Sequence, residues 1–225
     1  MSRFLFTVSL MCLILAFACG EAWAHKPVVI DGGPTDAQTA HDVPDPGVSY
    51  VGYHEATPGA PALWFTFEAR QGTPLYLQPG VPKIDRFGAL RPAMALLGPG
   101  LPAVEVPFAV PEGYGGQVFF TDDQAPVVFE EEFTGTTSWQ FPAVELAAPV
   151  TGRYYLVGYL PGGESGKFWM AIGEEEAFGL ADLFTLPQTL VQVRLFHEIF
   201  PFGGILGWAL VFMLLAVSGF IFWFL

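Results

Sequence analysis

Charged residues are scarce in this sequence, and most of them are acidic. Only 14% of the 225 residues are charged, with 9 Lys and Arg against 22 Asp and Glu, which gives a formal net charge of −13. Nucleic-acid binders rely on clusters of Lys and Arg, so this deficit excludes that class. Average globular chains carry roughly 25% charged residues, and the shortfall indicates that part of the chain is meant for lipid.

Cysteine is nearly absent as well. The sequence has 2 cysteines, Cys12 and Cys19, and both lie in an apolar N-terminal segment that has the pattern of a signal peptide. If that segment is removed, the mature chain contains no disulfide, no thiolate metal site and no cysteine nucleophile. Export of this protein therefore does not imply a disulfide-stabilised scaffold.

The N-terminal segment predicts secretion. A basic residue near its start is followed by an uncharged apolar run over residues 4–18, and Ala22-Trp23-Ala24 supplies small residues where signal peptidase requires them. We predict a signal peptide over residues 1–24 and a mature chain that begins at His25. The alternative is lipidation of Cys19, with processing at that residue instead.

An uncharged apolar run follows the last charged residue, Glu198. Residues 203–225 alone are long enough to cross a hydrocarbon core of about 30 Å. Trp208 lies near one end of this run, where amphipathic rings favour the membrane interface. We expect one transmembrane helix over residues 201–225, which would anchor the exported part of the chain at the periplasmic side of the cytoplasmic membrane.

Between these two segments the sequence predicts one β-rich domain. Residues 25–47 are rich in Pro, Gly and Asp and are expected to form an irregular arm. Over residues 48–173, short aromatic and β-branched runs alternate with Gly- or Pro-containing turns, a pattern typical of strands. Strands are expected at residues 48–53, 63–67, 75–77, 93–97, 118–120, 127–133, 154–157 and 167–172. We therefore predict a mainly β fold, an antiparallel, jelly-roll-like β-sandwich.

The end of the exported part is expected to contain a hairpin and then helices. The last two predicted strands would form a β-hairpin across the Gly-rich turn at residues 161–166. Residues 174–200 are expected to form short helices at the membrane surface. The first would open with Glu174-Glu175-Glu176, whose charges suit the positive end of a helix dipole. The second would begin at Pro187 as a juxtamembrane helix.

Three stretches of the domain share a pattern of strands and turns. They are residues 63–77, residues 91–100, and residues 148–157 together with Gly166-Lys167-Phe168. Thr151-Gly152-Arg153-Tyr154-Tyr155 lies in the third stretch. In this pattern, residues 48–173 resemble the bacterial pre-peptidase C-terminal domains, although an insertion at residues 101–140 exceeds a minimal domain. The resemblance implies a β-sandwich and an accessory binding or folding role, because such domains are usually appended to secreted enzymes.

His25 is the sharpest candidate for metal binding. As the first residue of the mature chain, it offers an α-amino group and a ring nitrogen that can chelate Cu(II) together, since amine and imidazole ligands suit copper. A second imidazole would come from His54, at the end of a predicted strand, or from His41 in the arm. The alternative is that signal peptidase merely leaves His25 at the terminus and that the other two are surface residues. No other cofactor is predicted.

Acidic clusters are a second candidate for chemistry. Strand alternation places Glu131 on the face shared by Phe129 and Phe133, with Glu130 and Glu132 on the other face. A calcium loop with regularly spaced aspartates is absent from the sequence. Nothing in the sequence sets a carboxylate separation suited to glycoside hydrolysis. A solvated acidic face is the simpler interpretation, and we do not expect an enzyme.

Aromatic residues make up 16% of the chain and offer contacts for a partner. Trp139 in the insertion, Phe141 directly after it, and Trp208 in the apolar C-terminal run are candidate interface residues, with core or lipid packing as the alternative. We therefore predict a non-enzymatic, membrane-anchored accessory subunit that docks onto a membrane or periplasmic protein complex. The alternatives are a copper-binding protein that uses His25 and a glycan- or cell-wall-binding module that uses exposed aromatic residues.

Overall fold

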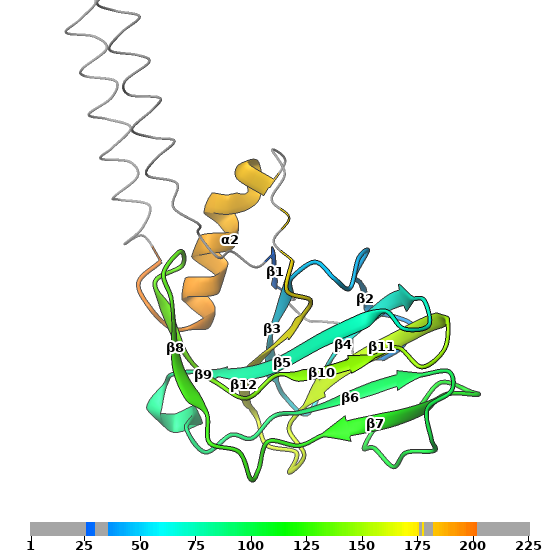
Figure 1. Cartoon of the computed structure of the whole chain (residues 1–225). Helices are drawn as coiled ribbons and strands as arrows, with labels where there is room; N and C mark the ends of the chain where they lie inside the picture. The colour runs from blue at the N-terminus through cyan, green and yellow to red at the C-terminus, as the bar shows by residue number, and fades with distance from the viewer. Residues whose placement is uncertain (1–25, 30–35, 176, 178–181, 202–225) are drawn as a thin grey trace, which may run out of the picture.

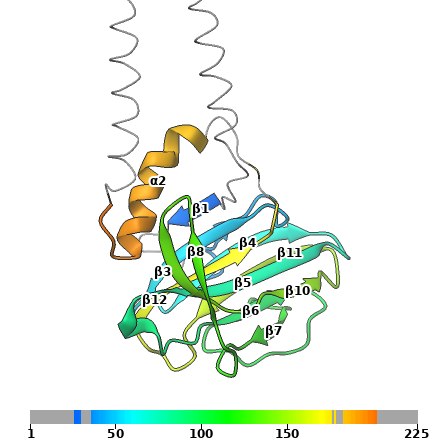
Figure 2. The same ribbon diagram turned by 60° about the vertical axis from the view of Figure 1, so that its left-hand side comes forward.

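The predicted aromatic and β-branched runs form the strands of two sheets that face each other across an apolar core (Figure 1). This computed structural model describes residues 26–29, 36–175, 177 and 182–201. One helix, α2 (Asp182–Phe196), lies over the outer face of one sheet, as Figures 1 and 2 both show. The fold is thus mainly β, as the sequence predicts.

The sheet beneath α2, called sheet A, has seven strands in the order β1-β3-β12-β5-β9-β8, with β10 also paired to β5. All neighbours are antiparallel except β1, which runs parallel to β3. Strand β5 is long enough for β9 to pair with Gly80–Pro82 and β10 with Pro74–Leu77. The strands are β1 (Lys26–Val29), β3 (Tyr50–Ala56), β5 (Pro74–Pro82), β8 (Val127–Glu131), β9 (Thr136–Gln140), β10 (Val144–Ala147) and β12 (Gly166–Ile172).

The second sheet, sheet B, has five strands in the order β2-β4-β11-β6-β7. Its strands are β2 (His41–Asp42), β4 (Ala62–Ala69), β6 (Ala93–Gly98), β7 (Gly115–Phe119) and β11 (Gly152–Tyr159). A short 3-10 helix, η1 (Asp85–Phe87), lies between β5 and β6. Alternate residues of β4, such as Phe65 and Phe67, face sheet A and are at most 1% exposed. The strand period of two therefore selects which side chains form the core.

The prediction of a hairpin between the last two strands is wrong. Strand β11 lies in sheet B between β4 and β6, whereas β12 lies in sheet A between β3 and β5. The two strands face each other across the core, since a Cβ atom on Gly158 would lie 2.8 Å from the ring of Phe168. Strand β12 is buried along its whole length and β11 over Leu156–Tyr159, and each has a neighbouring strand on both edges. Residues 160–165 therefore connect the two strands across the gap of about 10 Å between packed sheets.

The segment expected to be an irregular arm contributes to both sheets. Strand β1 adds to the edge of sheet A, and β2 adds to the edge of sheet B. Val43, which follows β2, is 1% exposed and belongs to the core. Pro and Gly shorten these strands, but they do not prevent pairing at an edge, where one side of the strand needs no hydrogen-bond partner.

The expected helix start at Glu174-Glu175-Glu176 is wrong for its two described residues. The backbone N–H groups of Glu174 and Glu175 donate to the carbonyl oxygen of Gly47, at 3.0 and 2.8 Å, and hold this segment extended beside the start of β3. Gly173, with φ 78°, makes the turn out of β12. The described helix begins only at Asp182, and it continues through Pro187, which lacks the N–H for one helical bond.

The insertion divides into two parts. Residues 104–110 lie over the outer face of sheet B, where Val104, Val106, Phe108 and Val110 pack against the apolar cluster that contains Trp64. Strands β8 and β9 extend sheet A beyond β5 (Figure 1). Within the described part of the chain, no helix is both long and apolar enough to cross a membrane. The predicted signal peptide and, apart from Pro201, the predicted transmembrane segment lie outside the described residues.

Candidate functional site

The histidines predicted as metal ligands lie in different sheets. His54, on β3, is 3% exposed, and its Nε2 lies 2.9 Å from the carbonyl oxygen of Ala60. His41, on β2, packs against Phe65 with ring centroids 5.8 Å apart. Burial lowers the pKa of both histidines. In the described part of the chain no three His, Cys, Asp or Glu side chains lie close enough to hold a metal ion, and His25 falls outside that part.

Of the aromatic residues predicted to contact a partner, one is buried and one is partly exposed. Phe141 is 1% exposed and belongs to the core, and its backbone N–H donates to the carbonyl oxygen of Pro79 at 3.1 Å. Trp139 lies opposite Val128 of β8 and packs partly against the core. Trp208 lies outside the described residues. Only Trp139 of the three therefore contributes to a described surface.

A series of buried hydrogen bonds attaches α2 to sheet A. The indole Nε1–H of Trp169 on β12 donates to Oγ of Ser138 on β9 at 3.0 Å. The same Oγ lies 3.1 Å from Nε2 of His197, which directly follows the last residue of α2. Nδ1 of His197 lies 2.8 Å from the carbonyl oxygen of Val193, one turn earlier. All four side chains are at most 6% exposed, so water does not compete for these bonds.

The two ends of this series decide the direction of each bond. An indole nitrogen can only donate and a carbonyl oxygen can only accept, so Nδ1 of His197 carries the proton and Nε2 accepts from the Ser138 hydroxyl. Burial lowers the pKa of His197 to about 4, and the charge of Lys167 also lowers it, against the opposing effect of the bond to Val193. The imidazole is therefore neutral at pH 7, as this arrangement requires.

Ser138 and His197 have the separation of a nucleophile and its base, but their surroundings differ from those of an active site. Such a pair acts only where the serine reaches a cleft that a substrate can enter. Both side chains are 5% exposed, and the cavity beside them measures about 30 Å³. The second imidazole nitrogen bonds to a backbone carbonyl, with no carboxylate in that position. This arrangement serves to hold α2 on the sheet.

A cluster of charges holds the C-terminal end of α2. Glu198 accepts hydrogen bonds from Arg86, next to Phe87 in η1, and from Nζ of Lys167 on β12, the latter at 2.8 Å. These two bonds, Arg86 first, lower the pKa of Glu198 to about 2. Nζ of Lys167 also donates to the carbonyl oxygen of Phe196 at 3.1 Å, which satisfies one of the free carbonyls at the helix end. Lys167 is 9% exposed, so these two acceptors replace the water that a buried ammonium group loses.

Arg194 connects α2 to the turn between β8 and β9. Its Nη1 donates to the carbonyl oxygen of Thr134 at 2.6 Å, and its Nε donates to the carbonyl oxygen of Phe200 at 2.9 Å. The chain is thus attached to the sandwich as far as Phe200, immediately before the predicted transmembrane segment. Helix α2 is part of the folded domain and is not a separate connector.

Strand β8 forms an edge of sheet A and exposes apolar side chains. It pairs only with β9 among the described strands. Val127 and Val128 are 62% and 53% exposed, and Glu130 and Glu132 beside them are exposed. Glu131 is half-buried, as strand alternation predicts, and its carboxylate accepts from the backbone N–H groups that open the turn. An edge strand with exposed valines offers free backbone groups and apolar surface to another strand.

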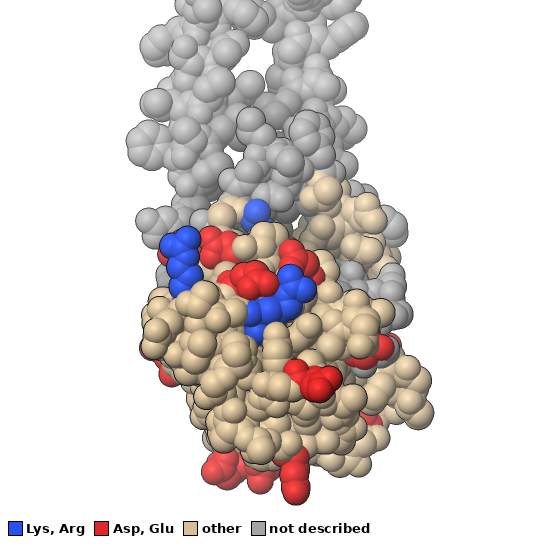
Figure 3. All heavy atoms as spheres, turned by 90° about the vertical axis from the view of Figure 1, so that its right-hand side faces the viewer, with Lys and Arg blue, Asp and Glu red and all other residues tan. Residues whose placement is uncertain are grey.

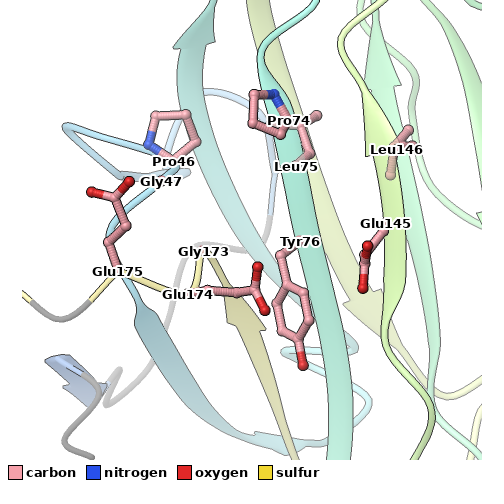
Figure 4. Close-up of a pocket in the computed structure, with 10 residues that line it drawn as sticks. All are labelled: Pro46, Gly47, Pro74, Leu75, Tyr76, Glu145, Leu146, Gly173, Glu174 and Glu175. Atoms are coloured by element: carbon pink, nitrogen blue, oxygen red, sulfur yellow. The ribbon is translucent and has the colours of Figure 1, made fainter.

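An acidic groove lies where β5 meets β10, next to the residues that follow β12 (Figure 4). It measures about 380 Å³ and is lined partly by Tyr76, Glu145, Glu174 and Glu175. Figure 4 shows the carboxylates of Glu145 and Glu174 on either side of the Tyr76 ring. Burial raises the pKa of the Tyr76 hydroxyl, and the charges of Glu174 and Glu145 raise it further. The groove is therefore unfavourable for anions.

Charges are unevenly distributed on the surface. On the face shown in Figure 3, basic and acidic side chains lie beside one another in the upper part, whereas only acidic side chains project at the lower end. One described pair joins Nε of Arg153 on β11 to Glu68 on β4 at 2.9 Å, but both side chains are more than half exposed. Exposed ion pairs of this kind contribute little to the stability of the fold, so the charge distribution matters mainly for the binding of partners.

The sequence did not predict the residues that hold α2 on sheet A. Ser138, Trp169 and His197 lie far apart in the chain and form no motif, so only the packing of α2 on sheet A brings them together. One signal was present for Lys167, because a lysine at the start of a fully apolar strand requires a partner for its charge. That signal does not identify Glu198 as the partner.

No known family model matches this chain, and no curated protein sequence matches it. Solved structures do show similarity. One is the pre-peptidase C-terminal domain of collagenase from Bacillus anthracis, with 10% identity, a TM-score of 0.32, and coverage of 61% of this chain and 96% of that one.

Two other similar structures are described as copper-binding proteins. The surface-associated protein CorA of Methylomicrobium album BG8 has 10% identity and a TM-score of 0.32, and the match covers 68% of this chain and 99% of that one. The secreted protein MopE of Methylococcus capsulatus has 11% identity and a TM-score of 0.30, over 68% of this chain and 100% of that one. A pre-peptidase C-terminal domain, the kind of domain that the sequence resembles, is thus among the structures similar to this chain.

Proposed function

We propose that this protein is a non-enzymatic accessory subunit, held at the periplasmic side of the cytoplasmic membrane, which binds another membrane or periplasmic protein along the open edge of β8. The observation that supports this most directly is the exposure of Val127 and Val128 on an edge strand, at 62% and 53%. Edge strands of this kind recruit a strand from a partner, with main-chain hydrogen bonds for affinity and side-chain contacts for specificity.

The charges beside the edge indicate what the partner strand would contain. Val127 and Val128 open β8, Glu130 lies exposed near its other end, and the exposed Glu132 directly follows the strand. A partner strand that pairs with β8 would therefore carry apolar residues opposite the valines and Lys or Arg opposite the glutamates. The net charge of −13 would also favour approach by a basic surface.

The attachment of α2 supports a role beside the membrane. Arg194 bonds α2 to Thr134 in the β8–β9 turn, and Lys167 bonds β12 to the end of the helix. The edge strand and residue 201, where the predicted transmembrane segment begins, thus belong to one fixed unit. A membrane partner would then meet the β8 edge in a constant orientation, which reduces the entropy lost on binding.

Site-specific crosslinking in native membranes tests this function. A photoreactive residue placed at Val128 is expected to capture one protein that also copurifies in stoichiometric amount with the full chain in mild detergent. Val150 is the matched control, because it is 42% exposed and lies outside β8. V128K is expected to abolish copurification and V150K to preserve it. A protein that migrates alone, or equal loss in both variants, would contradict the proposal.

Copper binding at His25 remains a separate proposal, supported by the chelating chemistry of an N-terminal histidine. The structure makes His54 a poor second ligand, since its ring is buried and bonded to Ala60. Lys26, next to His25 in the chain, pairs with Tyr50, which lies about 13 Å from His54 along β3 at about 3.3 Å per residue. Cu(II) titration of a chain that begins at His25, against the same chain with one alanine ahead, tests the idea: equal affinities would refute it.

A further inference from the structure

A pocket at one end of the sandwich is independent of both α2 and the β8 edge. It measures about 410 Å³, within the range of about 300–1,000 Å³ usual for small-molecule sites. Three segments form it: the residue pair before β6, the loop between β7 and β8, and the loop between β11 and β12. Both loops lie at the lower end of the sandwich in Figures 1 and 2. Its lining residues are Arg91, Phe120, Thr121, Asp122, Pro161, Gly162 and Glu164.

The pocket is built on fixed backbone. Thr121 is 4% exposed, and its hydroxyl donates to the carbonyl oxygen of Pro92 at 2.7 Å, which attaches the first loop to the start of β6. In the second loop the N–H of Gly163 donates to the carbonyl oxygen of Leu160 at 3.0 Å, and the φ of 73° at Gly163 suits glycine. Both loops are therefore shaped before any ligand arrives, which lowers the entropic cost of binding.

Arg91 is held in place and still has donors to offer. Its Nη1 donates to the carbonyl oxygens of Gly88 and Leu90 at 3.1 and 2.9 Å, and its guanidinium lies 5.5 Å from the ring centre of Phe141. Among the described residues nothing accepts from its Nε or Nη2. Since an arginine has five N–H donors in a rigid fork, the remaining ones can serve a ligand in a set direction.

The other side chains supply complementary chemistry. Phe120 is 51% exposed, an unusual position for an aromatic ring with no polar atom. Asp122 and Glu164 are exposed carboxylates that come from different loops. The pocket thus combines an apolar ring, two strong acceptors and a fixed donor. A molecule that matches all three has an apolar face and several hydroxyl groups around its edge.

We propose that this pocket binds a neutral saccharide. The ring of Phe120 would pack on the apolar face of a sugar ring, Asp122 and Glu164 would accept from its hydroxyl groups, and Arg91 would donate to a ring or glycosidic oxygen. Two carboxylates against one guanidinium, on a chain of net charge −13, disfavour acidic sugars. This site is separate from the proposed protein-docking edge, so either can fail alone.

Titration of the full chain in detergent with cellotetraose and with chitotetraose tests the site, followed by NMR shifts and by calorimetry. Saturable binding of at least one of the two is expected. F120S is expected to weaken it about tenfold or more, the effect of losing about 1.4 kcal/mol. F200S is the matched control, because Phe200 is 66% exposed and lies outside the pocket, and it should bind as the wild type does.

A second variant keeps the test decisive. E164Q removes a charge from an exposed loop residue without removing bulk, so it should fold and should weaken binding while leaving the melting temperature unchanged. The proposal would be overturned if neither sugar bound at a concentration of about 10 mM, because the binding free energy would then be weaker than about 3 kcal/mol. Binding that F120S and E164Q leave unchanged would overturn it equally, because the sugar would then occupy another site.

Discussion

Acid is expected to release α2 from sheet A, because this contact requires a neutral His197. Burial lowers the pKa of His197 to about 4 in the folded protein, whereas an exposed histidine has a pKa of about 6.5. Below pH 6.5 the imidazole of His197 becomes protonated when the helix is released and exposed to water, whereas in the buried state it stays neutral down to about pH 4. The stabilisation by the buried neutral form is therefore complete above pH 6.5 and is lost progressively as the pH falls to 4.

The size of the effect follows from the two pKa values. A difference of about 2.5 corresponds to about 3 kcal/mol at pH 4, since one pKa unit is worth about 1.4 kcal/mol. His197 is 5% exposed, so solvent screening reduces this value little. Helix α2 covers only one face of sheet A, and the core between the sheets does not depend on it. The loss should therefore increase local opening of α2 before it unfolds the sandwich.

Hydrogen exchange measured by mass spectrometry between pH 7 and 4 checks this prediction. After correction for the intrinsic effect of pH, peptides from α2 should lose protection by about 100-fold relative to peptides from β11. His197→Gln cannot titrate but can still accept from Ser138, so its α2 should stay protected above pH 4.5. Glu198, with its pKa of about 2, remains charged there. The reasoning would be refuted if His197 titrated near pH 6.5 in the intact protein. It would also be refuted if acid reduced the exchange protection of α2 equally in the His197→Gln variant.

Three further substitutions test other contacts. Gly98→Ala should lower the free energy of unfolding by about 1–3 kcal/mol in chemical denaturation, because a Cβ atom there would lie 2.2 Å from the Tyr154 ring. Ser138→Ala should cost about 1–3 kcal/mol in the same assay, since it leaves an indole and an imidazole without a partner. Glu198→Gln should speed exchange in α2 more than Arg86→Gln does, because the Arg86 side chain is 56% exposed whereas the glutamate also serves a buried lysine.

Each substitution has its own control. Gly59→Ala should leave stability nearly unchanged, because no atom lies within 4 Å of the added Cβ, and an equal loss at Gly59 and Gly98 would contradict the packing argument. Thr137→Ala, next to Ser138 on the opposite face of β9, should cost less than Ser138→Ala. Equal acceleration of α2 exchange in the Arg86 and Glu198 variants would show that Lys167 does not need its carboxylate.

Local pattern predicted the strands β3 to β8, β11 and β12, but it missed β9 and β10 as well as the two short strands of the arm. The runs that begin at Leu63, Ala93 and Lys167 all lie within strands, because alternation and β-branched or aromatic composition act over a few residues. Pairing was harder to predict, as the false hairpin between β11 and β12 shows. A Gly-rich connection allows a return within one sheet or a crossing to the other, and the choice depends on which neighbours bury both edges of each strand.

The candidate sites were predicted less well than the strands. Composition identified Trp139 and Phe141 as aromatic contacts, but only the packing separates the partly exposed first from the fully buried second. The saccharide pocket joins Arg91, Phe120 and Glu164, which are far apart in the chain and share no motif. The spacing of these residues along the sequence does not show that they lie close together. The loops that carry them are neighbours only because the sheet topology places the strands they connect side by side.

The sequence by itself determined the acidic surface, the expectation of export and anchoring, and the presence of a β-sandwich, because each depends on composition or on a period of a few residues. Only the tertiary structure decided that β11 and β12 face each other, that β1 and β2 join the sheet edges, and that α2 is fastened by Trp169, Ser138 and His197. Burial creates these contacts: a polar group removed from water must find a partner, and the fold alone determines which partner lies within reach.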